Sequence, residues 1–349
     1  MTRSQPGWQR ALASAGIIIG SVAVLGVLVW PQVIGAERIF VLAQAVALRG
    51  VLFIALVLAA LVCGVLSLRA RKRRPALITI ALALVLAAVL DASVIGARGV
   101  DAAGIGSATR GEVRILSWNT EHAAPGSKAI ADLVIAQGAS IVVLPETDSG
   151  ATTEIASRIK ATGLPVYADT IEQDFPGSTP TSLLVVGDLV TAGYRHASAA
   201  GSTPGQPSGL WESTDPTAPI IGAVHTVPPM PWAMPLWSSG LDWAADNCVD
   251  ARVVMAGDFN ATSDHFSSLG IDGGAVGRCH DAAGELSAAS RGTWPSNVPE
   301  LLASPIDHVL VGSAWEVSGF DVLDPGAAQG SDHRPILAIL RSREAEPGT

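Results

Sequence analysis

The chain has 349 residues, of which 49% are hydrophobic, and a mean hydropathy of +0.40. These values exclude a single small domain and an ordinary soluble protein. Residues 1–111 carry 11 Lys/Arg and 3 Asp/Glu, whereas residues 112–349 carry 11 and 28. So acidic a second region repels polyanions and lacks the basic surface that gives most non-specific affinity for DNA, which excludes long duplex DNA as the default substrate.

Three apolar runs occupy the first region: Ala11–Trp30, Val51–Leu68 and Ala76–Ile95. Each has about the ~20 residues that a helix needs to cross a bilayer. Their only ionisable side chains are Asp91, near one end of the third run, and Cys63. We therefore expect a membrane domain over residues 1–96 with three transmembrane helices. Buried helices of a soluble protein are the alternative reading.

Basic residues indicate the orientation of these spans. Arg3 and Arg10 precede the first span, and a dense cluster lies between the second and third: Arg69, Arg71, Lys72, Arg73 and Arg74. Both groups belong in the cytoplasm by the positive-inside rule. We expect a multi-pass protein of the cell membrane with a cytoplasmic N-terminus and an extracytoplasmic acidic region. Residues 97–111, rich in Gly, Ala and Ser, are predicted to form a flexible linker.

From Glu112 to Arg341 the sequence changes to short apolar runs bounded by Gly, Pro, Asp and Ser, which are typical of buried strands. The runs are VRILSWN, ASIVVLPE, TSLLVVGDL, PIIGAVHT, ARVVMAGDFN, IDHVLV and ILAIL. Helical spacing occurs at Ser127–Gln137, Thr152–Ala161 and Trp237–Asp246. This order predicts a layered α/β or α+β domain over residues 112–341. Residues 342–349 are predicted to be a disordered tail.

Polar residues stand where these apolar runs begin or end: Asn119, Glu146, His225, Asp258, Asn260, Asp307, Asp332 and His333. Polar groups at strand ends project from a rigid sheet into one shared rim, as in many active sites. Carboxylates, amides and imidazoles suit Mg²⁺ or Mn²⁺, and the sequence has no Cys-x-x-Cys or His-Glu-x-x-His that would favour zinc. The pattern predicts a phosphoester site with a hard cation.

Six segments, in the order SWNTE, LPETD, VHT, GDFNAT, PIDHVLV and GSDHRP, resemble the endonuclease/exonuclease/phosphatase superfamily, in a membrane-anchored bacterial form. The resemblance covers about residues 112–341. It implies the two-sheet α/β sandwich of the deoxyribonuclease-I-like proteins, preceded here by the three spans. It also implies that Asn119, Glu146 and Asp332 hold or orient Mg²⁺ or Mn²⁺, with Glu146 as the principal ligand.

The resemblance further implies a catalytic group. Asp258 orients or deprotonates the attacking water, Asn260 binds a non-bridging oxygen, and His333, oriented by Asp307, meets the phosphate. His225 matches the second catalytic histidine of the deoxyribonuclease branch. The sequence departs from the superfamily pattern at Pro145, which stands where Gln usually precedes the glutamate, and this leaves the substrate open.

Other residues have weaker motif support. Trp294, in GTWP, is a candidate for stacking against substrate, although packing is the alternative. His308 follows Asp307 and so faces the opposite side of its strand, where we expect a structural role. We expect surface or supporting roles for the remaining histidines, of which His122 is the least secure because Asn119 lies three residues earlier: His122, His196, His265 and His280.

Two further features surround the predicted site. The proline-rich segment Pro228–Trp237 follows His225 and is predicted to be an apolar loop, which either contacts a membrane or lipid or folds back over its own core. Cys248 and Cys279 bracket the GDFN strand and are predicted to form a disulfide in an oxidising compartment, with a reduced buried pair as the alternative.

The sequence thus predicts an extracytoplasmic, Mg²⁺- or Mn²⁺-dependent phosphoester hydrolase, with no obligate protein partner. Its substrate is expected to be a short nucleic acid, a phospholipid or a small phosphodiester, and nuclease and phospholipid phosphodiesterase activities both stay open. A non-catalytic membrane receptor that binds phosphorylated ligands is the hypothesis from a different class.

Overall fold

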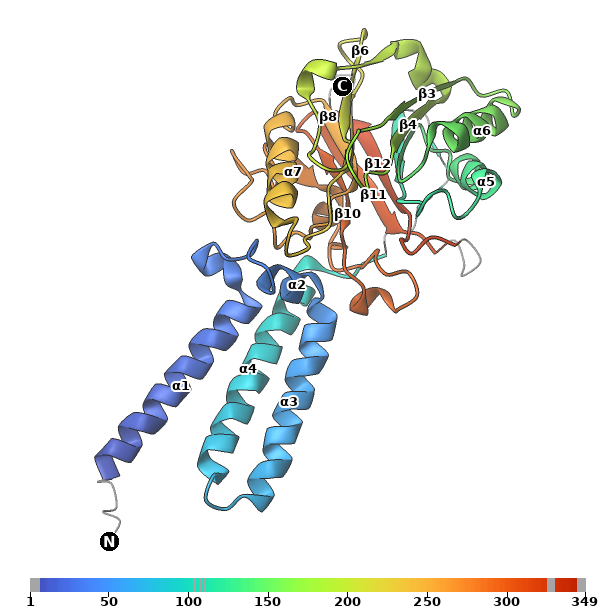
Figure 1. Cartoon of the computed structure of the whole chain (residues 1–349). Helices are drawn as coiled ribbons and strands as arrows, with labels where there is room; N and C mark the ends of the chain where they lie inside the picture. The colour runs from blue at the N-terminus through green and yellow to red at the C-terminus, as the bar shows by residue number, and fades with distance from the viewer. Residues whose placement is uncertain (1–6, 103–104, 107, 110, 325–329, 344–349) are drawn as a thin grey trace, which may run out of the picture. The chain divides into compact units, whose positions relative to one another are not determined.

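The computed structural model describes residues 7–102, 105–106, 108–109, 111–324 and 330–343, without the side chains of residues 7–15, 17 and 18 (Figure 1). Contacts divide the chain into two compact units, Met1–Ala97 and Arg98–Thr349. The first unit is helical. Its elements are α1 (Gly7–Val29), the 3₁₀ helix η1 (Pro31–Ile34), α2 (Leu42–Ala47), α3 (Arg49–Arg69) and α4 (Arg74–Arg98), whose last residue belongs to the second unit.

Two described helices, α3 and α4, are long and apolar enough to cross a membrane. They correspond to the second and third predicted spans. The first predicted span falls in α1, where the apolar stretch with described side chains is only Ile19–Val29. The described residues therefore support two of the three predicted transmembrane helices by length and composition.

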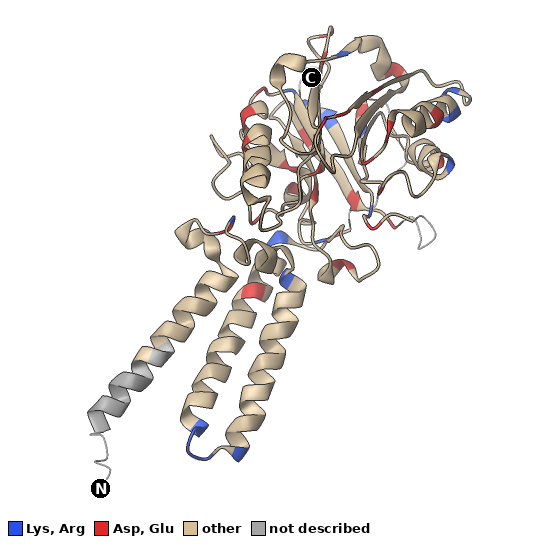
Figure 2. Ribbon diagram, in the orientation of Figure 1, with Lys and Arg blue, Asp and Glu red and all other residues tan. Residues whose placement is uncertain are grey.

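The acid predicted within the third span is paired. Asp91 in α4 is buried, and its Oδ1 lies 2.6 Å from a guanidinium nitrogen of Arg49 at the start of α3. Arg49 also donates to the carbonyl of Val29 at 3.2 Å. Because a buried charge is costly without a partner, this contact explains how an acid is tolerated in an apolar helix. Figure 2 shows the basic residues gathered at the turn between α3 and α4.

The second unit is an α/β sandwich, as predicted, whose described residues form two mixed six-stranded sheets. In spatial order, sheet A contains β11 (Trp315–Val322), β12 (Ile336–Ser342), β1 (Glu112–Ser117), β2 (Ile141–Pro145), β4 (Thr181–Val186) and β3 (Val166–Ile171). Sheet B contains β5 (Tyr194–His196), β6 (Gly209–Ser213), β7 (Ile220–His225), β8 (Val253–Asp258), β10 (Asp307–Val311) and β9 (His280–Asp281). The pairs β1–β2 and β7–β8 are parallel, whereas the others are antiparallel.

Burial on both faces explains why the central strands are apolar throughout. Ile115 of β1 faces the core between the sheets, whereas Leu116 packs on the other side with residues of α5 (Ser127–Gln137) and α6 (Ser149–Lys160). Figure 1 shows these two helices over sheet A and α7 (Met234–Asn247) beside sheet B. The three predicted helices are present, and α7 begins earlier than expected because Pro235 fits the first turn of a helix.

Several described residues of the predicted linker and tail make defined contacts. Arg98 donates to the buried carboxylate of Asp264 at 2.6 Å, and Gly99 accepts a backbone hydrogen bond from Ser290 at 3.0 Å. Gly99 has φ +78°, and a Cβ there would lie 2.0 Å from the carbonyl oxygen of Ser287, so only glycine fits. At the other end, β12 extends to Ser342, and residues 344–349 of the predicted tail lie outside the described residues.

Cys248 and Cys279 form the predicted disulfide, with their Cα atoms 5.7 Å apart. Both residues are fully buried. The bond joins the residue after α7 to the residue before β9. It therefore ties the helix that covers sheet B to the edge of that sheet.

Candidate active site

One end of the sandwich collects the polar residues predicted from the sequence. Parallel pairing of β1 with β2 continues past both strands, because Thr120 donates its backbone N–H to Pro145 at 3.1 Å. This places Asn119 beside Glu146. On sheet B the register pairs Asp258 with His225 in β7 and with Asp307 in β10. Since β12 runs antiparallel to β1, the residues just before β12, including His333, reach the same end.

Asn119 connects the two sheets. Its Nδ2 donates to Glu146 Oε1 at 3.2 Å and to Asp258 Oδ2 at 3.1 Å, while its Oδ1 accepts from the backbone N–H of Glu121 at 3.1 Å. Ionised carboxylates only accept and a backbone N–H only donates, so these partners fix the orientation of the amide. Asn119 is also buried. It holds two carboxylates in place, and its oxygen is already engaged.

His333 and Asp307 form a buried pair next to Asp258. His333 Nδ1 lies 2.9 Å from Asp307 Oδ2, and its Nε2 lies 3.7 Å from Asp258 Oδ2. The indole of Trp118 donates to the carbonyl of His333 at 2.9 Å, which fixes the backbone. One ligand atom from each of Asp258, Asp307 and His333 lies within 4.8 Å of the others.

Burial and neighbouring charges shift the pKa values of this group. Burial raises the pKa of Asp258 above its ordinary value, and the carboxylate of Asp307 adds to the effect although His333 opposes it. Burial alone would lower the pKa of His333, but the charges of Asp307 and Asp258 outweigh it and raise that pKa. The arrangement therefore favours an imidazolium at His333 and a proton-accepting carboxyl at Asp258.

His225 differs from His333 in charge. Its Nε2 lies 3.8 Å from Glu146 Oε1, and its Nδ1 is buried without a hydrogen-bond partner among the described residues. Burial, together with the nearby charge of His333, lowers the pKa of His225 to about 3. The imidazole is therefore neutral at physiological pH.

Two site residues have left-handed backbone conformations, with φ +59° at Glu146 and +46° at Asn260. Asn tolerates this region, whereas for Glu it is strained, and such strain clusters at functional sites. Asn260 donates its backbone N–H to Asp258 Oδ1 at 2.8 Å and its Nδ2 to the carbonyl of Thr226 at 2.9 Å. The indole of Trp237 donates to the carbonyl of Asn260 at 3.0 Å.

Asp332 and Trp294 lie on the exposed rim. Asp332 is 46% exposed, its Oδ1 lies 3.9 Å from His333 Nε2, and its Oδ2 accepts from Trp294 Nε1 at 2.7 Å. Of the three predicted metal-holding residues, the structure thus brings Asn119 and Glu146 into contact, whereas Asp332 makes its described side-chain contacts on the His333 side.

Two histidines that are not among the predicted site residues also make defined contacts. His308 lies on the other face of β10, where its Nδ1 is 3.0 Å from Asp281 Oδ2 and its Nε2 is 2.9 Å from the carbonyl of Ala261. His122 was expected to have a surface or supporting role, but its Nδ1 lies 3.3 Å from Glu146 Oε2. The signal available in the sequence was its closeness to Asn119.

The proline-rich segment Pro228–Trp237 is a loop only in its first part, because α7 begins within it at Met234, where prolines fit the first turn of a helix. Ala233 and Trp237 are buried, so this part of the segment packs against its own core. Met230 and Trp232 are instead exposed, at 47% and 69%. The segment therefore presents two large apolar side chains to solvent a few residues after a site histidine.

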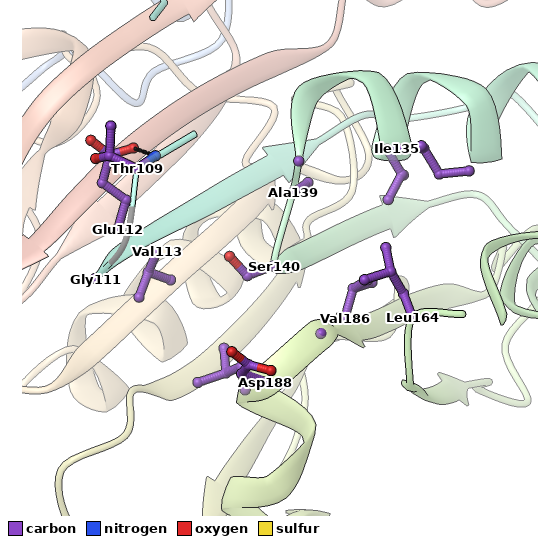
Figure 3. Close-up of a pocket in the computed structure, with 14 residues that line it drawn as sticks. Thr109, Gly111, Glu112, Val113, Ile135, Ala139, Ser140, Leu164, Val186 and Asp188 are labelled. Carbon is purple, nitrogen blue, oxygen red and sulfur yellow. Dashed lines mark hydrogen bonds between the residues drawn. The ribbon is translucent and has the colours of Figure 1, made fainter. Parts of the chain in front are cut away.

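A cavity of about 500 Å³ lies at the opposite end of β1, where that strand begins (Figure 3). It is lined by Glu112, Ser140, Leu164, Asp188 and other residues. Burial alone would raise the pKa of Glu112, but hydrogen bonds from Thr109 and Arg341 and the charge of Arg114 lower it to about 2. A carboxylate held this way is a structural anion, so the cavity is not the candidate site.

Comparison with solved structures finds similar chains at low sequence identity. A humanized D. rerio TDP2 with 14 mutations has 11% identity and a TM-score of 0.50, covering 66% of this chain and 100% of its own. A functionally unknown conserved protein from Enterococcus faecalis V583 has 17% identity and a TM-score of 0.46, covering 66% and 100%. An endonuclease/exonuclease/phosphatase from Beutenbergia cavernae has 17% identity and a TM-score of 0.45, covering 67% and 72%.

No curated protein matches the chain significantly. A family model, described as the Endonuclease/Exonuclease/phosphatase family, does match residues 116–333. The matched segment begins in β1 and ends at His333, so it includes the strand ends that form the site. The chain belongs to the endonuclease/exonuclease/phosphatase family.

Proposed function

We propose that this protein is a membrane-anchored, divalent-metal-dependent phosphoester hydrolase that acts on the extracytoplasmic side. One observation carries the proposal: the Asp307–His333 pair, 2.9 Å apart, lies next to Asp258. Asn119 in turn connects Asp258 to Glu146 through hydrogen bonds to both carboxylates. Phosphoryl transfer needs charge neutralisation and an oriented water more than covalent chemistry. This group offers both from rigid strand ends.

Each residue has a role in the proposed reaction. Asp258, with its raised pKa, orients the attacking water and accepts its proton. His333, held by Asp307, points its free Nε2–H toward a phosphate oxygen and stabilises the developing negative charge. Asn260 binds a non-bridging oxygen, and neutral His225 donates or accepts a hydrogen bond beside Glu146.

Mg²⁺ or Mn²⁺ fits at Glu146 rather than at the Asp258–Asp307–His333 cluster. The imidazolium favoured at His333 repels a cation, whereas the carboxylate of Glu146 has one oxygen toward the interior and one toward solvent. Carboxylate oxygen is the ligand type that these metals prefer. When bound, the metal would neutralise phosphate oxygens and the leaving group. Asp332 would then orient His333 and Trp294 at the rim.

The proposed location rests on three independent features. Helices α3 and α4 are long and apolar enough to span, and α1 is proposed as a third span. The basic turn between α3 and α4 favours a cytoplasmic position, which places the chain after α4 outside. The disulfide Cys248–Cys279 favours an oxidising compartment. We propose the domain limits 1–96, 97–111 and 112–341 for the anchor, the linker and the catalytic domain.

For the substrate, we propose a phospholipid or small phosphodiester. The acidic surface disfavours long nucleic acid, and the exposed side chains of Met230 and Trp232 suit an apolar group. Trp294 is proposed to contact the substrate from the rim. A nuclease acting on short or single-stranded nucleic acid is the second candidate, favoured by His225, which resembles a catalytic histidine of that branch.

The test is hydrolysis of bis-p-nitrophenyl phosphate by the full-length protein in detergent, with Mg²⁺ or Mn²⁺ and with EDTA. We expect metal-dependent activity that Glu146→Gln and Asp258→Asn each reduce by about 10²-fold or more. Unchanged activity in both folded variants would refute the site. Binding of phosphorylated ligands without hydrolysis would favour a receptor, and a panel of phospholipids, nucleotides and oligonucleotides separates the two substrate classes.

A further inference from the structure

The turn after β1 has an unusual backbone. Three consecutive residues, none of them glycine, have positive φ: +48° at Glu121, +62° at His122 and +57° at Ala123. Such conformations are unfavourable for residues other than glycine and persist only when the surroundings impose them. Here Asn119 Oδ1 accepts from Glu121 N–H at 3.1 Å, and Thr120 Oγ1 accepts from Ala123 N–H at 3.1 Å. The first residues of the turn thus fix its shape.

Contacts from distant parts of the chain hold this turn against the site. Glu121 Oε2 accepts the backbone N–H of Asp332 at 3.0 Å, across 211 residues. The hydroxyl of Thr120 donates to the carbonyl of Glu146 at 3.2 Å and lies 2.7 Å from that of Thr147. The turn is therefore fastened to the residues that flank the site on both sides.

The imidazole of His122 is therefore held in position but remains accessible to solvent. His122 is 71% exposed, and its Nδ1 lies 3.3 Å from Glu146 Oε2. The two oxygens of Glu146 consequently have different neighbours. Oε1 accepts from Asn119 at 3.2 Å and faces His225 at 3.8 Å, whereas Oε2 faces His122. Asn119 presents its Nδ2 to this carboxylate, while its Oδ1 accepts from the turn.

We propose that His122 is a metal ligand, and that its Nδ1 and Glu146 Oε2 together hold the divalent cation at the solvent-facing edge of the site. This inference rests on the proposed function and names the nitrogen donor of that metal site. Adjacent ligands of an octahedral ion with bonds of about 2.1 Å lie about 3.0 Å apart, close to the separation of these two atoms. An imidazole ligand favours Mn²⁺ over Mg²⁺ more than an all-oxygen site does.

The test is pulsed electron paramagnetic resonance of Mn²⁺ bound to the full-length protein in detergent. We expect ¹⁴N modulation from a coordinated imidazole in the wild type and its loss in His122→Gln. His280→Gln, which changes a histidine of β9 away from the site, is the matched control and should keep the signal. Persistence of the nitrogen coupling in His122→Gln, or its loss in His225→Gln instead, would overturn the assignment.

Mn²⁺ affinity gives the second readout. His122→Gln should weaken Mn²⁺ binding by at least about tenfold, because even groups that only support metal ligands change affinity 10–100-fold. Mg²⁺ binding should fall less, so the preference for Mn²⁺ narrows. Melting temperatures of the metal-free proteins should match, since His122 is exposed. If the wild type binds Mn²⁺ but His122→Gln binds it equally well, this inference fails alone; if the wild type binds neither ion, the proposed metal dependence fails with it.

Discussion

Strand β10 carries two histidine–aspartate pairs that use adjacent residues and opposite faces. On one face Asp307 holds His333 at 2.9 Å, and on the other His308 meets Asp281 at 3.0 Å. Both pairs are buried. The Nε2 atoms of the two histidines have different surroundings. That of His333 lies 3.7 Å from Asp258 Oδ2, whereas that of His308 lies 2.9 Å from the carbonyl oxygen of Ala261. One histidine has a ring nitrogen left for a ligand, and the other has none.

The comparison separates the pair that is proposed to be catalytic from a pair of the same two residue types with a structural role. Both ring nitrogens of His308 face oxygen acceptors, an arrangement that favours the doubly protonated imidazolium. Asp281 in turn accepts the backbone N–H of Ala283 and begins α8 (Ala282–Glu285). Burial opposes this charge, but Asp281 outweighs it and raises the pKa of His308. Distance and burial alone do not separate the two histidines; the ring nitrogen left free on His333 does.

The largest expected effect is on rate. His333→Gln should lower kcat for bis-p-nitrophenyl phosphate by about 10²–10⁴-fold, the usual contribution of a positioned acid or base. His308→Gln, corrected for the folded fraction, should retain a rate close to the wild type. Equal losses of kcat in the two variants would contradict the proposal that His333, but not His308, takes part in catalysis.

The next effect is on the free energy of unfolding, where His308→Gln should have the larger effect and His333→Gln the smaller one. His308→Gln leaves the buried carboxylate of Asp281 without its charge partner, which usually costs about 3–5 kcal/mol. Urea unfolding of the metal-free proteins measures this change. The double variant His308→Gln/Asp281→Asn should recover part of the loss, and a double variant as unstable as the sum of the single changes would contradict the pairing.

A smaller effect should appear in the pH dependence of stability. The folded pKa of His308 lies above its unfolded value of about 6.5, so the pair stabilises fully below that pH and loses this stabilisation as the pH rises through the folded pKa. The difference in Tm between wild type and His308→Gln, measured with EDTA, should therefore shrink above about pH 6.5. A difference that grows with pH would show that His308 is not charged in the fold.

The smallest effect concerns Trp294, which donates to Asp332 on the exposed rim beside His333. Trp294→Phe keeps an aromatic ring but removes the hydrogen bond to Asp332, and should raise KM about 2–10-fold, as expected for one hydrogen bond. Trp243→Phe is the matched control, because its indole donates to Ala200 at 2.8 Å in another part of the unit. Equal KM values for the two variants would exclude a substrate contact at Trp294.

Sequence reasoning predicted the central strands because they are apolar on both faces. Strands β1, β2, β4, β7, β8, β10 and β12 correspond to predicted runs. It missed β11, whose buried and exposed residues alternate, and also β3, β5, β6 and β9. In β11 the apolar residues are separated by polar ones and by Gly, so they form no continuous apolar run, and the neighbour that pairs with the strand is not visible in the sequence.

The same limit applies to the site. Residues at strand ends were predictable, because a strand end fixes where its side chain projects, and the alternation of side chains also placed His308 correctly on the other face. The sequence assigns His122 only a surface or supporting role, because no motif includes it. Its position depends on the contact of Glu121 with Asp332 and on a backbone conformation that sequence pattern does not encode.

The left-handed backbone at Glu146 has a consequence for engineering this protein. Glycine adopts that conformation without strain, so Glu146→Gly relaxes the chain at the position of the carboxylate that is proposed to hold the metal. Selection for thermal tolerance alone would thus enrich glycine at residue 146 and remove the proposed metal ligand. Directed evolution on this scaffold therefore requires a screen for turnover in every round.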